Sequence, residues 1–296
     1  MTRTPHFFKV KSRIGLTSPP IRNRELNNGV EDAPDFLLTK DLLENFNNPE
    51  IDNFIFSNPE DITDNYWPIV AKESKNLKNL INQKIKPNEI QIVIGGDNTV
   101  TLPSLEAVVE RVSNAEQVGY IQFDSHGEMH QSKTSLSGNF HGMYMRPFFD
   151  KFDIPEIDDL VLEKLKTSQI LTIGDILFDG EKTEEEQFYQ QNKIRNINVS
   201  EFDKDKENVL SEINHFLKSY QHIHINFDID VFHRSVSSAT GLPEDGRWFK
   251  EQIFTILDLI ANHKSISLDL VEINPKKEGA EKTIKLAQDI LLKLIN

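Results

Sequence analysis

The sequence alternates between short apolar runs and longer amphipathic segments along its whole length. Apolar runs of strand length lie at 53–56, 90–94, 118–123, 169–173, 194–199, 222–227 and 265–273. Between them, apolar residues recur at three- and four-residue steps, as on one face of a helix, within 67–85, 105–112, 209–217, 249–260 and 278–295. This alternation predicts a mostly parallel sheet with helices on both faces. No linker, repeat or low-complexity tract interrupts it, so we expect residues 1–296 to form a single domain.

The composition excludes several classes of function. The chain carries 33 Lys and Arg against 47 Asp and Glu, a formal net charge of −14. Binding to nucleic acid or to an anionic membrane requires a basic surface, so we expect neither partner. The absence of cysteine excludes disulfides, thiolate zinc sites and a cysteine nucleophile. The N-terminus lacks the apolar stretch of a secretory signal and no run approaches membrane-spanning length, so we expect a cytoplasmic protein.

Polar residues that can bind metals follow directly after the apolar run 118–123. The next seven residues, DSHGEMH, place Asp124, His126, Glu128 and His130 at every second position. Side chains alternate between the two faces of a strand. These four would therefore share one face if the chain stayed extended beyond Phe123.

Three other expected strands also end in polar motifs. The run 90–94 leads into GGDN at 95–98, the run 222–227 leads into DID at 228–230, and the run 265–273 contains Glu272. Open parallel sheets bind ligands at the carboxyl ends of their strands, so these motifs would meet at one edge. Several carboxylates in one crevice repel each other unless a cation lies between them.

The residue types at this edge indicate which metal would bind. Carboxylates with one or two imidazoles and no thiolate suit manganese, iron or cobalt better than structural zinc. Each motif alone also has an ordinary explanation: an Asp-x-Asp pair is common at a strand end, GGDN can be a plain loop, and His126 can be a hydrogen-bonded histidine. The combination of four strand ends favours a metal site.

The order of these motifs resembles that of the ureohydrolases, the family of arginase, agmatinase and formiminoglutamase. The resemblance runs from about Gly29 onward and rests on NNGVEDAP (27–34), GGDN (95–98), DSHGEMH (124–130), SGNFHG (137–142), FDID (227–230), TGLPEDG (240–246) and VEINP (271–275). It implies a three-layer α/β/α fold and a binuclear manganese site. It also implies hydrolysis of a guanidino or amidino C–N bond by metal-activated hydroxide, with an arginase-like release of urea.

The resemblance also implies a role for each matching residue. The implied metal ligands are Asp124 and Asp228, which bridge the two ions, His126 and Asp230 for the deeper ion, and Asn98 and Glu128 for the outer ion. Glu272 matches the carboxylate that fixes the guanidinium, and His141 matches a proton-shuttle histidine. The residues that match substrate-tail contacts are His130, Ser135, Ser137, Asn139 and Asp179, and ordinary turn chemistry can also explain the polar loop residues.

The chain departs from the family pattern at the outer metal position. The family has His where this chain has Asn98, and Asp where it has Glu128. His130 stands where arginases usually have Asn, and His233 stands at a position that is usually acidic. A neutral amide oxygen is a poorer ligand than imidazole, so we expect one tight manganese ion and a second that is weak or absent.

Two classes of function follow from these observations. The first is a metal-dependent hydrolase of a small guanidino compound, arginase-like because the SLSGNFHG loop is kept, with agmatinase, guanidinobutyrase or formiminoglutamase activity as variants. The second is a non-catalytic homologue with a regulatory or binding role, supported by Asn98. The resemblance also implies a homo-oligomer, as a trimer or hexamer.

Overall fold

The computed structural model describes residues 4–16, 27–62, 65–178, 183–243 and 245–296. Its centre is one eight-stranded sheet with the strand order β2-β1-β3-β8-β7-β4-β5-β6. Every pairing between neighbouring strands in it is parallel. The strands are β1 (Thr4–Lys11), β2 (Glu50–Ile55), β3 (Glu89–Ile94), β4 (Val118–Phe123), β5 (Ile170–Ile173), β6 (Arg195–Ile197), β7 (His222–Asp228) and β8 (Ile266–Val271).

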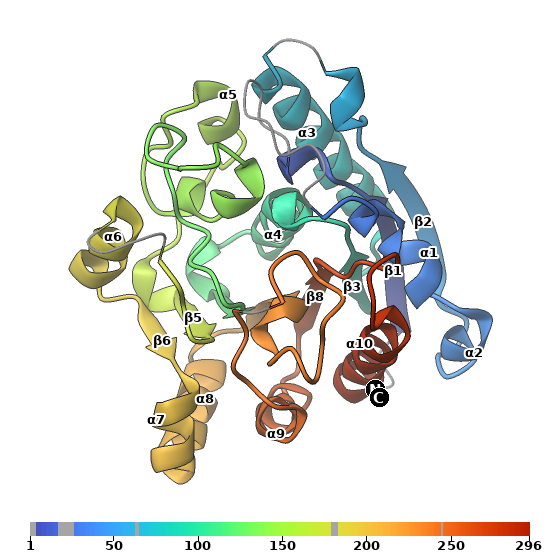
Figure 1. Cartoon of the computed structure of the whole chain (residues 1–296), viewed down its shortest axis with the longest axis vertical. Helices are drawn as coiled ribbons and strands as arrows, with labels where there is room; N and C mark the ends of the chain where they lie inside the picture. The colour runs from blue at the N-terminus through green and yellow to red at the C-terminus, as the bar shows by residue number, and fades with distance from the viewer. Residues whose placement is uncertain (1–3, 17–26, 63–64, 179–182, 244) are drawn as a thin grey trace.

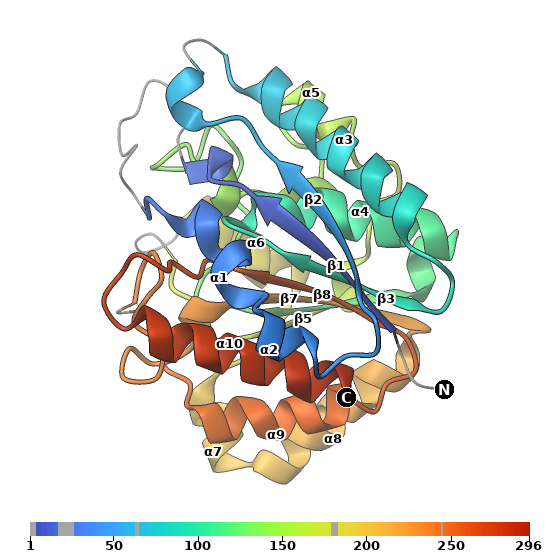
Figure 2. The same cartoon turned by 90° about the vertical axis from the view of Figure 1, so that its right-hand side faces the viewer.

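Helices cover both faces of the sheet, which gives three layers (Figures 1 and 2). One face is covered by α3 (Trp67–Lys84), α4 (Thr101–Val112) and α5 (Pro155–Asp158), and α6 (Glu184–Asn192) adds Phe188 and Tyr189 to the same core. The helices of the other face are α1 (Ala33–Leu37), α2 (Lys40–Leu43), α7 (Val199–Lys204), α8 (Lys206–Ser219), α9 (Lys250–Ile260) and α10 (Ala280–Ile295). The predicted α/β/α architecture is confirmed.

The two faces of the central strands differ in polarity. In β7, Ile223, Ile225 and Phe227 belong to the core beneath α8, α9 and α10. The alternate residues His224 and Asn226 are fully buried on the opposite face, toward α4. Because side chains alternate along a strand, this polar row leads directly to Asp228 at the end of β7.

The sequence pattern predicted most elements with small errors at their ends. The stripe ending before Pro87 is α3, and the remaining stripes correspond to α4, α8, α9 and α10. The strand β1 was missed, although it lies between β2 and β3 in the sheet. Its sequence, TPHFFKVK, contains only two adjacent apolar residues, Phe7 and Phe8, because His6 and Lys9 flank them, so it lacks an apolar run of strand length.

No helix in the described part of the chain combines the length and the apolar character needed to cross a membrane.

Candidate functional site

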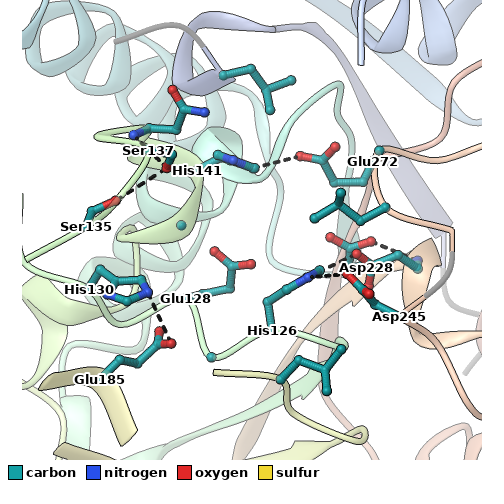
Figure 3. Close-up of a pocket in the computed structure, with 18 residues that line it drawn as sticks. His126, Glu128, His130, Ser135, Ser137, His141, Glu185, Asp228, Asp245 and Glu272 are labelled. Atoms are coloured by element: carbon teal, nitrogen blue, oxygen red, sulfur yellow. Dashed lines mark hydrogen bonds and ion pairs between the residues drawn. The ribbon is translucent and has the colours of Figure 1, made fainter. Parts of the chain in front are cut away.

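The strand ends that carry the polar motifs are neighbours in space. The four strands β3, β8, β7 and β4 are consecutive in the sheet, so their carboxyl ends form one continuous edge. A cavity of about 360 Å³ opens at this edge (Figure 3). The predicted site residues that line it are His126, Glu128, His130, Ser135, Ser137, Asn139, His141, Asp228, Asp230 and Glu272.

The cavity is strongly acidic. Its described lining includes the carboxyl groups of Glu128, Glu185, Asp228, Asp230, Asp245 and Glu272 and the imidazoles of His126, His130 and His141. No Lys or Arg is among the described residues that line it. The cavity therefore favours a cationic ligand over an anionic one.

Two groups of side chains could each hold a metal ion, and they share Asp124. Asp124, His126 and Glu128 each offer a ligand atom, and these atoms lie within 4.8 Å of one another. The same holds for Asp124, Asp228 and Asp230. The first group offers two carboxylates and an imidazole and the second three carboxylates, which are ligand types that manganese and iron accept.

The loop after β4 brings these residues together without remaining extended. The strand ends at Phe123, and Glu128 has a left-handed backbone with φ of 61°. The period-two extension through His130 is therefore wrong, because the chain turns at Glu128. Asp124, His126 and Glu128 still converge, whereas Nε2 of His130 lies 3.3 Å from Oε2 of Glu185.

Glu128 fits a bound cation particularly well. Its carboxyl group is buried, and Oε2 has no hydrogen-bond partner among the described residues. A buried carboxylate oxygen without a donor is costly, and a left-handed conformation in a residue other than glycine adds strain. A cation beside Glu128 would offset both costs, which is why we consider the residues present compatible with a divalent metal.

The pKa values of these groups reflect the same accumulation of charge. Burial and then the neighbouring Asp230 raise the pKa of Asp124 to about 6. Burial and nearby carboxylates raise the pKa values of Glu128 and Asp228 well above the usual range. Burial opposes protonation of His126, but the surrounding carboxylates outweigh it and raise its pKa well above normal. Burial is the largest cause of the three carboxyl shifts, and the neighbouring negative charge, which a cation would compensate, adds to them.

Asn98 lies beside Asp228 and presents its amide nitrogen, rather than its oxygen, to that carboxylate. Its Nδ2 donates to Oδ2 of Asp228 over 2.8 Å, and its Oδ1 accepts from Nδ2 of Asn226 over 3.0 Å. Similarly, Nε2 of Gln122 donates to Oδ2 of Asp124 over 3.1 Å. In this arrangement amide donors partly compensate the charge of both aspartates.

Gln122 and Asn226 were not singled out from the sequence. The signal was present, because each stands two residues before the first aspartate of its motif, in QFD and NFD. Residues two apart on a strand point to the same face, so both amides had to lie beside the carboxylates. Asp245 was also missed; its Oδ2 lies 3.1 Å from Nε2 of His126.

Glu272 lies on the same side of the cavity as Asp228, with His141 pointing toward it (Figure 3). Its Oε2 accepts from Nδ2 of Asn27 over 2.7 Å, and its Oε1 accepts from the backbone N–H of Asn98 over 3.2 Å. Nδ1 of His141 lies 3.4 Å from the same Oε1. Glu272 also has a φ of 61°, so its backbone, like that of Glu128, is held in a strained conformation.

The remaining predicted residues border the cavity. Oγ of Ser135 lies 3.4 Å from Oγ of Ser137, and Asn139 follows in the same loop. The pair of His130 and Glu185 forms another part of the wall, and Glu185 also accepts from the N–H of Met129 over 2.7 Å. Asp179 lies outside the described residues.

Comparisons with known proteins agree with this fold. The model of the Arginase family matches residues 13–296, so the chain belongs to the Arginase family. The arginase of Staphylococcus aureus (strain COL) is 28% identical over 231 residues, which cover 77% of this chain and 74% of that protein.

Solved arginase structures share the fold. The arginase of Bacillus caldovelox has a TM-score of 0.85 at 23% identity, covering 100% of this chain and 99% of that one. The arginase of Entamoeba histolytica, solved in complex with L-ornithine, has a TM-score of 0.84 at 23% identity with the same coverage.

Proposed function

We propose that the protein is a metal-dependent hydrolase that cleaves a guanidino C–N bond and releases urea. The observation that carries the proposal is the convergence of Asp124, His126, Glu128, Asp228 and Asp230 in two potential metal groups. All of these residues except the buried Asp124 line the acidic cavity. Membership of the Arginase family supports the reaction class. The substrate would be a small molecule with a cationic head.

The cavity suits a guanidinium group. This cation is planar and carries several N–H donors, so it pairs well with a carboxylate. Glu272 would receive it, because its position is fixed by Asn27 and by the N–H of Asn98. The rest of the substrate would extend toward Ser135, Ser137 and Asn139 in the wall of the cavity.

The residues divide the chemistry between them. Asp124, His126, Asp228 and Asp230 would hold the tight ion, with Glu128 and residue 98 beside a weaker second one. A bound divalent cation supplies a water molecule whose pKa is low enough to be deprotonated near neutral pH. The carboxylates among these residues would orient that water toward the guanidinium carbon.

His141 would complete the reaction as a proton donor. The water adds to the guanidinium carbon, the C–N bond to the substrate tail breaks, and the leaving nitrogen takes a proton to depart as an amine. Nδ1 of His141 lies beside Glu272, where the guanidinium would bind, so it is placed to deliver that proton. Urea and the amine are the products.

Several further predictions rest on the family resemblance. They are manganese as the metal, a cytoplasmic location, assembly into a trimer or hexamer, and substrate contacts from His130 and Asp179. Each has a direct test, namely metal analysis of the purified protein, localisation of the tagged chain, sedimentation velocity, and kinetic study of the two variants.

A non-catalytic role is the second candidate, and Asn98 favours it. Its amide nitrogen, rather than a ligand atom, faces Asp228. A protein that has lost the second ion could retain the cavity to bind a guanidino compound without cleaving it. Binding without turnover would then be the activity on which selection acts.

Hydrolysis of a panel of compounds separates the two candidates. The manganese-loaded protein is incubated with arginine, agmatine, guanidinobutyrate and formiminoglutamate, and the products are identified by mass spectrometry. Cleavage of one compound, abolished by Asp228→Ala, supports the hydrolase and names its substrate. Binding of a panel compound without cleavage of any contradicts the hydrolase and supports the non-catalytic role.

A further inference from the structure

A chain of buried hydrogen bonds leads away from the metal groups behind Asn98. Nδ2 of Asn226 donates to Oδ1 of Asn98 over 3.0 Å and to Oγ1 of Thr101 over 2.8 Å. The hydroxyl of Tyr144 donates to Oδ1 of Asn226 over 3.2 Å, and the hydroxyls of Tyr144 and Tyr120 lie 3.1 Å apart. We call Asn98, Asn226, Thr101 and Tyr144 the amide relay.

The direction of these bonds decides what Asn98 offers to a cation. Because Asn226 donates to the oxygen of Asn98, only the nitrogen of Asn98 remains to face Asp228. An amide nitrogen that carries two hydrogens cannot bind a metal, whereas the amide oxygen can. In this direction the relay therefore blocks the outer metal position.

The hydrogen bonds of the relay can also run in the opposite direction. The amide oxygen and nitrogen of Asn98 and of Asn226 then exchange places, and the other heavy atoms stay where they are. If both amides turn over, Nδ2 of Asn98 donates to Oδ1 of Asn226 and its oxygen faces Asp228. Hydroxyl groups donate or accept as required, so Thr101 can donate to the turned Asn226 and Tyr144 can accept from it. No backbone movement is needed, since each amide turns about a single bond.

The two directions differ in their hydrogen-bond count. In the direction of the structure, both N–H bonds of the Asn226 amide have acceptors in Asn98 and Thr101. In the reversed direction, one of them has no acceptor within the relay, and a buried donor without a partner is costly. The reversed direction therefore needs an added interaction, which a cation coordinated by Asn98 and Asp228 would supply.

We propose that the amide relay makes the outer metal position conditional: a second ion binds there only when Asn226 and Asn98 turn together. This inference rests on the proposed metal-dependent function and explains why the second ion is weaker than the first. Part of the cost of reversal is the hydrogen bond that Asn98 donates to Asp228, and the rest lies in Asn226, outside the ligand set. A residue that never touches the second ion therefore contributes to the affinity for it.

The substitution Asn226→Asp tests the relay directly. A carboxylate only accepts, so it fixes the reversed direction, with the nitrogen of Asn98 toward residue 226 and its oxygen toward Asp228. Asn98, Thr101 and Tyr144 can all donate to it. Asn139→Asp is the matched control, because it makes the same chemical change in the wall of the same cavity at a residue that is not a member of the relay.

The readout is ion binding, which does not depend on turnover. Manganese is titrated into each variant, with free ion counted by electron paramagnetic resonance and exchange coupling between bound ions followed in the same spectra. The wild type should bind one tight ion. Asn226→Asp should tighten the second by about tenfold or more and give a coupled pair, whereas Asn139→Asp should change it by less than about threefold.

Equal effects of the two substitutions, or two equivalent tight ions in the wild type, would overturn the relay. If Asn226→Asp fails to fold, Asn98→Asp decides. Its carboxylate accepts from Asn226 and still presents an oxygen to the outer position, so it must bind a second ion tightly, and failure to do so overturns the relay. If a variant gains a second ion but hydrolyses no compound, the result contradicts the proposed function and still supports the amide relay.

Discussion

Nδ1 of His126 lies 3.1 Å from Oδ2 of Asp230, which joins the end of β4 to the end of β7. The two residues come from separate motifs and meet because their strands are neighbours in the sheet. Oδ1 of Asp230 also accepts from the N–H of Ser125 over 3.2 Å, so the carboxylate is fixed relative to the loop that carries His126. This cross-strand contact is the core of the proposed tight metal position.

The substitution Asp230→Asn should weaken the tight ion by about a hundredfold or more, since it removes a charged ligand while keeping the shape of the side chain. Manganese titration by calorimetry measures the change. The exposed Asp159→Asn is the control and should bind as the wild type does. Unaltered affinity in Asp230→Asn would show that the ion binds elsewhere.

The substitution Asn98→His should strengthen the second ion and raise manganese-dependent hydrolysis by about tenfold or more, because imidazole replaces an amide at the outer position. Turnover is measured on the compound that the panel identifies. Asn98→Leu is the matched control: it has a similar size, offers neither a ligand nor a donor, and should give no gain. A loss of activity in both variants would mean that the native amide is required.

The substitution Glu272→Gln should raise KM by about tenfold or more with a smaller effect on kcat, because the lost charge binds the guanidinium in the ground state as well as in the transition state. Gln keeps the shape of the side chain but can accept from only one of the two donors, Asn27 and the N–H of Asn98, that point at Glu272. Steady-state kinetics separate the two constants. An unchanged KM would remove Glu272 from substrate binding.

His222 should make the fold sensitive to acid. Its ring nitrogens contact Oγ of Ser265 and Oγ of Ser267, each at 2.8 Å, and burial followed by the neighbouring His224 lowers its pKa to about 3. Below the ordinary value of 6.5 the unfolded chain takes up a proton that the folded chain refuses. The contribution of His222 to stability should therefore be constant above about pH 6.5 and fall as the pH approaches 3.

The variant His222→Gln should reduce that dependence, by about 1 kcal/mol between pH 7 and pH 5 after allowance for partial exposure. Urea midpoints at the two pH values measure it. The exposed His215→Gln should keep the wild-type slope. The same dependence of stability on pH in the wild type and both variants would show that His222 is not the origin of the acid sensitivity.

The layers of the fold were predictable because strand and helix periodicities differ. The runs in β7 and β8 have an apolar row facing one core, and the stripe in α3 ends before Pro87 as expected. β1 was not predictable by the same rule, because His6 and Lys9 flank its two adjacent apolar residues and leave no apolar run of strand length. The short helices α1, α2 and α7 have too few turns to show a period.

The residues of the site were predictable, but the orientation of the Asn98 amide was not. Motif order brought Asp124, His126, Asp228 and Asp230 together, because adjacent parallel strands end at one edge. The direction in which Asn98 points depends on Asn226 and Tyr144, which are distant in the sequence. Only the packed structure shows which end of an amide faces a carboxylate.

The central claim is that these strand ends bind a divalent cation, and anomalous diffraction tests it most directly. Crystals soaked in manganese are measured on both sides of the manganese absorption edge. The account predicts a strong anomalous peak coordinated by Asp124, His126, Asp228 and Asp230, with a weaker peak or none beside Glu128. No peak at these residues, in crystals that bind manganese elsewhere or not at all, would contradict it.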